Sequence, residues 1–277
     1  MIMIARHDLR VGARRIVSRV GSLVRQTTEP RILMYHRIFD SKHRLAVAPD
    51  LFIQHLDLFQ EMRLEVLSVK ELLSRRGEPG LSAIALSFDD GYPEMAEFVA
   101  PALKARGMNA TFFVLPRFAE KPQELSPEAE WADGGRDFLS RDQIIHLDRE
   151  GFEIAAHGLT HHCMPDLPDK EARHEIIQSR RELESLLGHP ISGFAYPKGS
   201  YFPHHSLMAD QAGYDYAVTV DPGHLSSGPL EHLLPRTEVA GGDDPELLRD
   251  KLAGGLDLWH QYIQKTRRIT NFISRRA

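Results

Sequence analysis

Cysteine is nearly absent from this sequence: Cys163 is the single one among 277 residues. One cysteine excludes an intrachain disulfide, so nothing in the sequence requires an oxidising compartment. Long apolar runs are absent as well, and no stretch of about 18 residues has the apolar character of a transmembrane helix. The N-terminal residues are rich in arginine and lack the apolar core of a secretory signal. We therefore expect a cytoplasmic protein.

The charges are segregated along the chain. Residues 1–28 contain six arginines and one aspartate, a net charge of +5, and residues 265–277 contain five basic residues and no acidic one. Because the whole chain carries −5, the stretch between these ends carries −15. Apolar residues recur every three or four positions near the N-terminus, which predicts a basic amphipathic helix over 1–28. They are Leu9, Ala13, Ile16, Val20 and Leu23.

Two interpretations of these basic ends stay open. A basic amphipathic helix can lie on an anionic membrane surface, which here would be the inner face of the membrane. It can equally pack on the protein body with its arginines solvated or paired to acidic neighbours. Nucleic-acid binding is not expected, because the acidic body lacks a broad basic face. The sequence predicts nothing about the oligomeric state.

Between the ends, strand-like apolar runs alternate with amphipathic stretches. The 42% hydrophobic content and the length suit one domain with one large core, to which we assign residues 29–264, with 265–277 as a basic tail. The alternation predicts an α/β fold with helices outside a parallel sheet and a site at the C-terminal strand ends. Strands are predicted at 31–37, 64–68, 82–88, 110–115, 152–156, 192–196, 215–220 and 234–239. Helices are predicted at 50–62, 93–106, 141–150, 169–187, 203–212 and 245–264.

Two short segments carry most of the chemistry. The segment Ser87-Phe88-Asp89-Asp90-Gly91 closes an apolar run typical of a buried strand, so both aspartates should lie at the strand tip, where a glycine lets the chain turn. The segment His157-Gly158-Leu159-Thr160-His161 follows a second strand-like run, and its two histidines are within reach of one ion. One carboxylate and two imidazoles suit a catalytic divalent metal, with a second carboxylate left for proton transfer. Each segment alone has a simpler interpretation, a turn or a surface histidine pair; their order and placement favour the metal site.

These two motifs, followed by Phe194-Ala195-Tyr196-Pro197-Lys198-Gly199, resemble the polysaccharide deacetylase family, the NodB-homology domain of carbohydrate esterase family 4. The resemblance includes the strand-like runs 32–38 and 110–114 and spans roughly residues 30 to 240. It implies a single-domain distorted (β/α) barrel. It also implies an enzyme that uses a divalent metal to remove N-acetyl, sometimes O-acetyl, groups from glycans.

Carried over by position, the resemblance makes Asp89 the general base and Asp90, His157 and His161 the metal ligands. The ligand set suits zinc and also accepts cobalt, nickel or iron. The third motif of the family is usually Arg-x-Pro-Tyr-Gly, and the arginine that helps to hold the catalytic aspartate is absent here. Arg236 is our candidate replacement. The alternative is that Arg236 pairs with a surface carboxylate such as Glu238.

The sequence also departs from the family pattern at the motifs for the general acid and for substrate contacts. The family's Asp-x-x-x-Trp motif and its Leu-x-x-His motif, which supplies a general acid, are not found cleanly. His224 and His232 lie in loop-like sequence without the expected flanking pattern. Lys198 replaces a common tyrosine, but a backbone N–H near it would still stabilise an oxyanion. The remaining members of the motif, Tyr196, Pro197 and Gly199, are expected to contact substrate with it.

The stretch 116–140 breaks the alternation and is predicted to be a long loop on the active-site face. Its Trp131 would stack against a sugar ring or anchor the loop to the barrel. His36 ends the first strand and would line the pocket or serve as a hydrogen-bonded core histidine. We interpret His162 and Cys163 as neighbours of the metal site rather than ligands.

The function that the sequence favours is metal-dependent removal of N-acetyl groups from an amino-sugar-containing polysaccharide or glycan precursor. Exopolysaccharide, lipopolysaccharide and peptidoglycan precursors would all present the same amide. One alternative is an inactive family member that binds glycan or membrane, because the usual arginine and terminal histidine are missing. A second is a non-haem iron oxygenase, which also uses two histidines and a carboxylate but has no need of Asp89.

Overall fold

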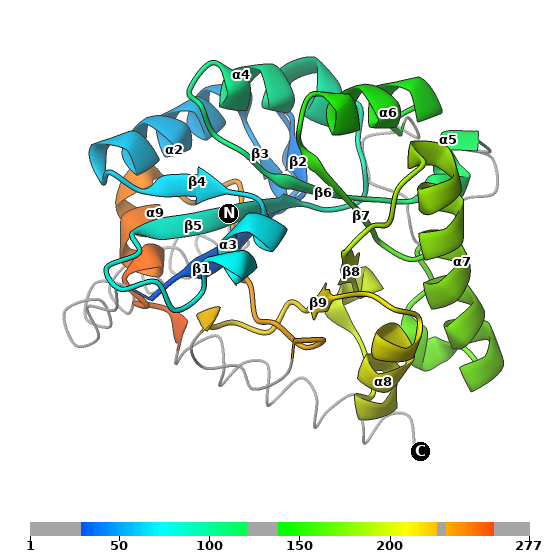
Figure 1. Cartoon of the computed structure of the whole chain (residues 1–277). Coiled ribbons are helices and arrows are strands. Elements are labelled where there is room, and N and C mark those ends of the chain that lie inside the picture. Colours follow the sequence, from blue (N-terminus) through cyan, green and yellow to red (C-terminus); the bar gives the residue numbers. More distant parts are fainter. Residues whose placement is uncertain (1–28, 121–137, 226–230, 258–277) are drawn as a thin grey trace, which may run out of the picture.

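A curved parallel sheet forms the centre of the computed structural model of the protein, which describes residues 29–120, 138–225 and 231–257 (Figure 1). The sheet order is β10-β1-β5-β6-β7-β8-β9, and β4 pairs with β5 beside β6. The predicted N-terminal helix, the C-terminal tail and Trp131 lie outside the described residues. The strands are β1 (Arg31–Tyr35), β4 (Glu65–Leu67), β5 (Ala83–Phe88), β6 (Thr111–Val114), β7 (Glu153–Ala156), β8 (Gly193–Ala195), β9 (Tyr216–Val218) and β10 (Thr237–Glu238).

Helices cover the outside of the curve. Figure 1 shows α2, α4, α6 and α7 following one another around the strands. Because both faces of the sheet are covered, β1, β5 and β6 are buried along their whole length instead of alternating between core and solvent. None of the described helices is long and apolar enough to cross a membrane. The helices are α2 (Pro49–Glu61), α3 (Val69–Ser74), α4 (Ala100–Lys104), α5 (Pro116–Glu120), α6 (Arg141–Arg149), α7 (Asp169–Leu187), α8 (Pro203–Gln211) and α9 (Pro245–Leu252).

Most predicted elements lie where the pattern placed them, and two prolines explain where they do not. The predicted helix 93–106 is divided into a π-helical turn, Met95–Val99, and α4, because Pro101 has no N–H for a regular helical bond. The predicted strand 234–239 is reduced to β10 and an isolated bridge at Leu234, because Pro235 interrupts the ladder. The predicted helix 245–264 ends as α9 at Leu252 and continues as turns to the last described residues.

Several short features of the described residues were not predicted. A two-stranded sheet pairs β2 (Arg37–Ile38) with β3 (Ala46–Val47). Helix α3 follows Ser68, whose capping box with Glu71 is a signal that the sequence does contain. The stretch predicted as a loop from residue 116 begins as helix α5, so that part of the prediction was wrong. Its buried Phe118 packs against Phe138, which explains why the first turn after β6 stays helical.

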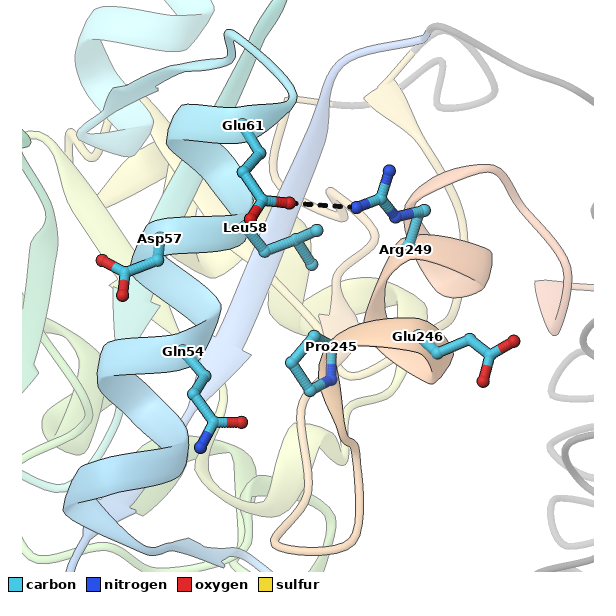
Figure 2. A pocket seen from close by; sticks show the side chains of 7 residues that line it. All are labelled: Gln54, Asp57, Leu58, Glu61, Pro245, Glu246 and Arg249. Carbon is cyan, nitrogen blue, oxygen red and sulfur yellow. Dashed lines mark hydrogen bonds and ion pairs between the residues drawn. The ribbon is translucent and has the colours of Figure 1, made fainter.

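Helices α2 and α9 pack side by side and enclose a groove of about 480 Å³ (Figure 2). Across its rim, Arg249 donates to the carboxylate of Glu61 at 3.3 Å. Leu58 and Pro245 contribute the apolar part of the lining. The groove contains none of the residues predicted to act in catalysis, so it is a seam between two helices rather than part of the predicted site.

The chain end of the described domain is tied to the first strand by a buried ion pair. Arg31 begins β1 and donates to both carboxylate oxygens of Asp257, at 2.9 and 2.7 Å. Its Nε also donates to the carbonyl of Leu252, the last residue of α9. The side chains of Arg31 and Asp257 are only 1% and 5% exposed, so each charge depends on the other for solvation.

Replacing Asp257 with alanine should therefore destabilise the protein by about 3–5 kcal/mol, because the guanidinium of Arg31 would stay buried without its counter-charge. Urea unfolding followed by circular dichroism measures this change. The matched control is Glu61→Ala, which breaks the exposed pair with Arg249 and should cost less than about 1 kcal/mol. Equal losses in the two variants would contradict the structural role of the buried pair.

Candidate active site

The two adjacent aspartates of the first motif follow β5, and both are buried. The backbone N–H of Asp89 still donates to the Tyr35 carbonyl at 3.0 Å, which extends the pairing of β5 with β1 by one residue. Asp90 then adopts φ 77°, and Gly91 adopts the same value, so the chain turns sharply. A left-handed conformation costs an ordinary residue about 1–2 kcal/mol. The sequence placed the turn at the glycine; the structure places it at both residues, which is how neighbouring carboxylates reach the same site.

The two histidines follow β7, which is separated from β5 by β6 in the sheet. His157 follows β7, and its backbone N–H donates to the Val114 carbonyl at 3.0 Å. Its ring Nδ1 lies 3.0 Å from the Ala195 carbonyl, so Nδ1 carries a proton and donates it. In the neutral ring this leaves the lone pair on Nε2. That atom is 3.3 Å from Oδ1 of Asp90, and so is Nε2 of His161.

These three residues fit a divalent metal. The potential ligand atoms of Asp90, His157 and His161 all lie within 4.8 Å of one another. Two nitrogens and one carboxylate oxygen form the donor set of catalytic zinc sites. The hydrogen bond to Ala195 also fixes the ring orientation of His157, as the partners of metal-binding histidines usually do. His161 differs, because its Nδ1 is buried without a hydrogen-bond partner among the described residues.

Asp89 faces a different partner. Arg236 donates to both of its carboxylate oxygens, at 2.6 and 2.7 Å, and both side chains are buried. The guanidinium is itself held by the Thr219 carbonyl at 2.8 Å and by the Ser87 hydroxyl at 3.2 Å. The alternative partner, Glu238, forms its ion pair with Arg44 instead.

The electrostatics keep both carboxylates charged. Burial alone would raise the pKa of Asp89, but the neighbouring Arg236 outweighs it and the pKa lies below its ordinary value. Burial also acts to raise the pKa of Asp90, and the hydrogen bonds from His157 and His161 bring it well below its usual range. For His157, burial lowers the pKa, yet the charges of Asp89 and Asp90 raise it overall. A field that favours a protonated imidazole equally favours a divalent cation at the same place.

The third motif follows β8 and lies against the histidine loop. Pro197 is so close to Gly158 that a Cβ there would be 3.2 Å from its Cγ. Lys198 is exposed and has φ 56°. Gly199 lies under Val220, where a Cβ would be 2.2 Å from Cγ2, so only glycine fits. Tyr196 is fully buried, and its hydroxyl donates to the His232 carbonyl at 3.1 Å. Contacts of these residues with substrate stay a prediction.

His36 lies between β1 and β2 in the field of the two aspartates. Desolvation lowers its pKa, and the charges of Asp89 and Asp90 act in the opposite direction without reversing the shift. The ring of His232, by contrast, lies 2.8 Å from the Tyr214 carbonyl and is occupied there. The structure thus places His36 within electrostatic range of the carboxylates, whereas the pattern only placed it at the end of a strand.

Two contributors to the site were missed. Tyr92 is buried directly after the first motif, and its hydroxyl forms a hydrogen bond with Asp90. Its position directly after Gly91 in the sequence could have indicated that it lies close to the site. Glu175 on α7 accepts hydrogen bonds from the histidine loop, at Leu159 and Thr160. No local pattern marks it, because a carboxylate on a charged helix ordinarily faces solvent.

The comparisons with known proteins agree with this geometry. A "Putative polysaccharide deacetylase YxkH" of Bacillus subtilis (strain 168) is 26% identical over 214 residues, which cover 76% of this chain and 71% of that protein.

Solved structures show the same fold. The Streptococcus pyogenes deacetylase PplD in complex with acetate superposes with a TM-score of 0.71 at 24% identity, covering 81% of this chain and 98% of that one. IcaB from Ammonifex degensii gives a TM-score of 0.65 at 21% identity, covering 85% and 98%. The predicted distorted (β/α) barrel is therefore confirmed.

The family model for polysaccharide deacetylase matches residues 76–217, a segment that begins before β5 and ends in β9. It thus contains both aspartates and both histidines of the site. Since the matched segment is more than half of the chain, the resemblance that the motifs carried is confirmed. The chain belongs to the polysaccharide deacetylase family.

Proposed function

We propose that the protein is a metal-dependent hydrolase that removes N-acetyl groups from an amino-sugar-containing polysaccharide or glycan precursor. The observation that carries the proposal is the division of labour between two adjacent carboxylates. Asp90 faces two imidazoles, whereas Asp89 faces a buried guanidinium. Hydrolysis of an amide needs both a centre that polarises the carbonyl and a separate base that accepts a proton from water.

Asp90, His157 and His161 would hold the metal, with zinc the first choice and cobalt, nickel or iron as alternatives. When bound, the metal would polarise the acetyl carbonyl and lower the pKa of water at the site. The hydrogen bond from Nδ1 of His157 to the Ala195 carbonyl selects, in the neutral ring, the tautomer whose Nε2 lone pair is available to a metal.

Asp89 accepts the proton of the attacking water. Its lowered pKa keeps it ionised at neutral pH, and the bidentate contact with Arg236 fixes its orientation. This contact supports Arg236 as the replacement for the arginine that the third motif lacks. The bond between carbonyl carbon and nitrogen then breaks, acetate is released, and the departing amine must take up a proton.

His36 is the group that we assign to proton delivery. It shares the field of Asp89 and Asp90, and the usual terminal histidine motif of the family is absent. A histidine that carries a proton between a carboxylate and a leaving amine acts as general acid. The main alternative is a catalytically weak or inactive protein that binds glycan or membrane, and the bidentate contact of Arg236 with Asp89 argues against it, because it replaces the missing arginine. The iron oxygenase alternative has no support in the family of the chain.

The cytoplasmic location stays a prediction, and so does contact of the basic ends with an anionic membrane, because 1–28 and 265–277 lie outside the described residues. Binding to anionic vesicles at low salt would test the second.

Metal dependence is tested by acetate release from N-acetylhexosamine oligomers. We expect activity to disappear after thorough chelation and to return when Zn²⁺ is added, because Asp90, His157 and His161 without an ion leave the acetyl carbonyl unpolarised. Asp90→Asn should bind metal weakly and stay inactive after the addition. Activity that survives complete metal removal would overturn the proposal.

Replacing Arg236 with methionine should lower kcat/KM about 10²- to 10⁴-fold while metal content is retained, since the base loses its orientation. The acidic limb of the pH profile should also move to higher pH. Burial raises the pKa of Asp89, and the charge of Arg236 is the largest of the influences that lower it, ahead of His157 and His36, so removing the guanidinium lets the pKa rise.

The matched control is Arg44→Met, which breaks the surface pair with Glu238 and should leave the rate and the pH profile unchanged. If Arg236→Met does not fold, Asp89→Asn keeps the shape of the site and should show the same loss of rate with metal bound. Normal turnover in either site variant would remove the pair from the mechanism.

The role of His36 is tested with two leaving groups. His36→Gln should lower kcat about 10²- to 10⁴-fold on an N-acetyl amide, whose amine must be protonated as it departs. The loss should be much smaller on an activated aryl acetate ester, because a phenolate of low basicity leaves without a proton. An equal loss on both substrates would show that His36 positions the substrate or the pocket and does not deliver the proton.

A further inference from the structure

A buried carboxylate on α7 faces the loop that carries the two histidines. Oε2 of Glu175 accepts the backbone N–H groups of Leu159 and Thr160, at 2.8 and 2.9 Å. Oε1 accepts the hydroxyl of Thr160 at 2.6 Å. The residue is only 7% exposed. One side chain thus makes three hydrogen bonds to two successive residues between His157 and His161.

The charge of Glu175 is costly where it lies. The same face of α7 places Ala172, Ile176 and Leu183 in the core. A buried carboxylate is tolerated only when it is paired or fully hydrogen-bonded. Within the described ranges no lysine, arginine or histidine forms an ion pair with Glu175, so the loop supplies its stabilisation. Packing of the helix alone would be served better by an apolar residue.

The loop, in turn, needs external support. Gly158 has φ 78° and His161 has φ 61°, a conformation that costs a residue other than glycine about 1–3 kcal/mol. His157 is oriented by its bond to the Ala195 carbonyl. His161 has no such bond at its buried Nδ1, and its other ring nitrogen lies 3.3 Å from Asp90, so the direction of the ring depends strongly on the backbone of the loop.

We infer that Glu175 is a positioning residue for the metal site, which fixes the strained loop and thereby the direction of His161. The inference rests on the proposed function, because it takes Asp90, His157 and His161 as the ligands. Glu175 touches neither metal nor substrate. It acts by holding Thr160, the residue next to His161, at both its backbone N–H and its hydroxyl. Thr160 also contacts Nδ1 of His162 at 2.6 Å, which extends the network beyond the loop.

The test measures the affinity of the metal-free full-length protein for Zn²⁺ by competition with a chromogenic chelator. Glu175→Ala should bind Zn²⁺ about 10–100-fold more weakly, the loss typical for partners that orient metal ligands. With Co²⁺ as probe, its visible absorption bands should change in shape, because His161 would no longer be held in one direction. Activity of the variant should recover as the metal concentration rises.

Two further variants and a control separate positioning from general stability. Glu175→Gln should keep most of the affinity, since its amide oxygen can accept both backbone N–H groups while Thr160 donates to His162 instead. Thr160→Val removes one of the three hydrogen bonds, and its affinity for Zn²⁺ should lie between those of Glu175→Gln and Glu175→Ala. The control, Glu171→Ala, removes an exposed carboxylate one turn earlier on α7 and should bind Zn²⁺ as tightly as the unmodified protein does.

The outcomes are distinct. An unmodified protein that binds no Zn²⁺ or Co²⁺ would overturn the metal site itself, and this inference with it. An unmodified protein that binds metal, together with Glu175→Ala that is folded and binds equally tightly, would overturn only the role of Glu175. If Glu175→Ala does not fold, Thr160→Val decides: unchanged affinity in that folded variant would contradict the inference.

Discussion

The buried pair between Asp89 and Arg236 is the interaction on which the rest of the site depends. Asp89 directly follows β5, an inner strand of the sheet, and Arg236 lies just before β10 at the edge, 147 residues later. The guanidinium also binds the Thr219 carbonyl, so it connects the end of β9 to the end of β5. Each charge would be costly alone in the core, and together they fix a carboxylate whose charge is maintained by its partner.

The fold separates the functions of neighbouring residues through the backbone. On a straight strand, Asp89 and Asp90 would point to opposite faces. Because Asp90 takes a left-handed conformation, its carboxylate turns to His157 and His161 while Asp89 stays with Arg236. His161 also has a left-handed backbone conformation, so both motifs of the site contain strained backbone. Strain of this kind persists only where surrounding contacts enforce it, here through buried pairs and hydrogen bonds.

The sequence predicted the elements whose signals are local. Helix α7 was predicted with its observed bounds, and most strands differ by one or two residues, because apolar periodicity and short polar segments mark them directly. The break before α4 and the short β10 depend on single prolines that interrupt backbone hydrogen bonds. Helix α5 was missed because its apolar contacts, such as Phe118 with Phe138, join residues on either side of the long stretch.

By itself, the sequence determined which residues offer ligands and a base, since Asp89, Asp90, His157 and His161 lie in short motifs at the ends of apolar runs. It suggested Arg236 without deciding between two partners. Only the tertiary structure chose Asp89 over Glu238 as the partner of Arg236, placed His36 within electrostatic range of the carboxylates and placed Glu175 against the histidine loop. The physical reason is that these contacts join segments far apart in the chain, whose meeting depends on the curvature of the sheet and not on any local pattern.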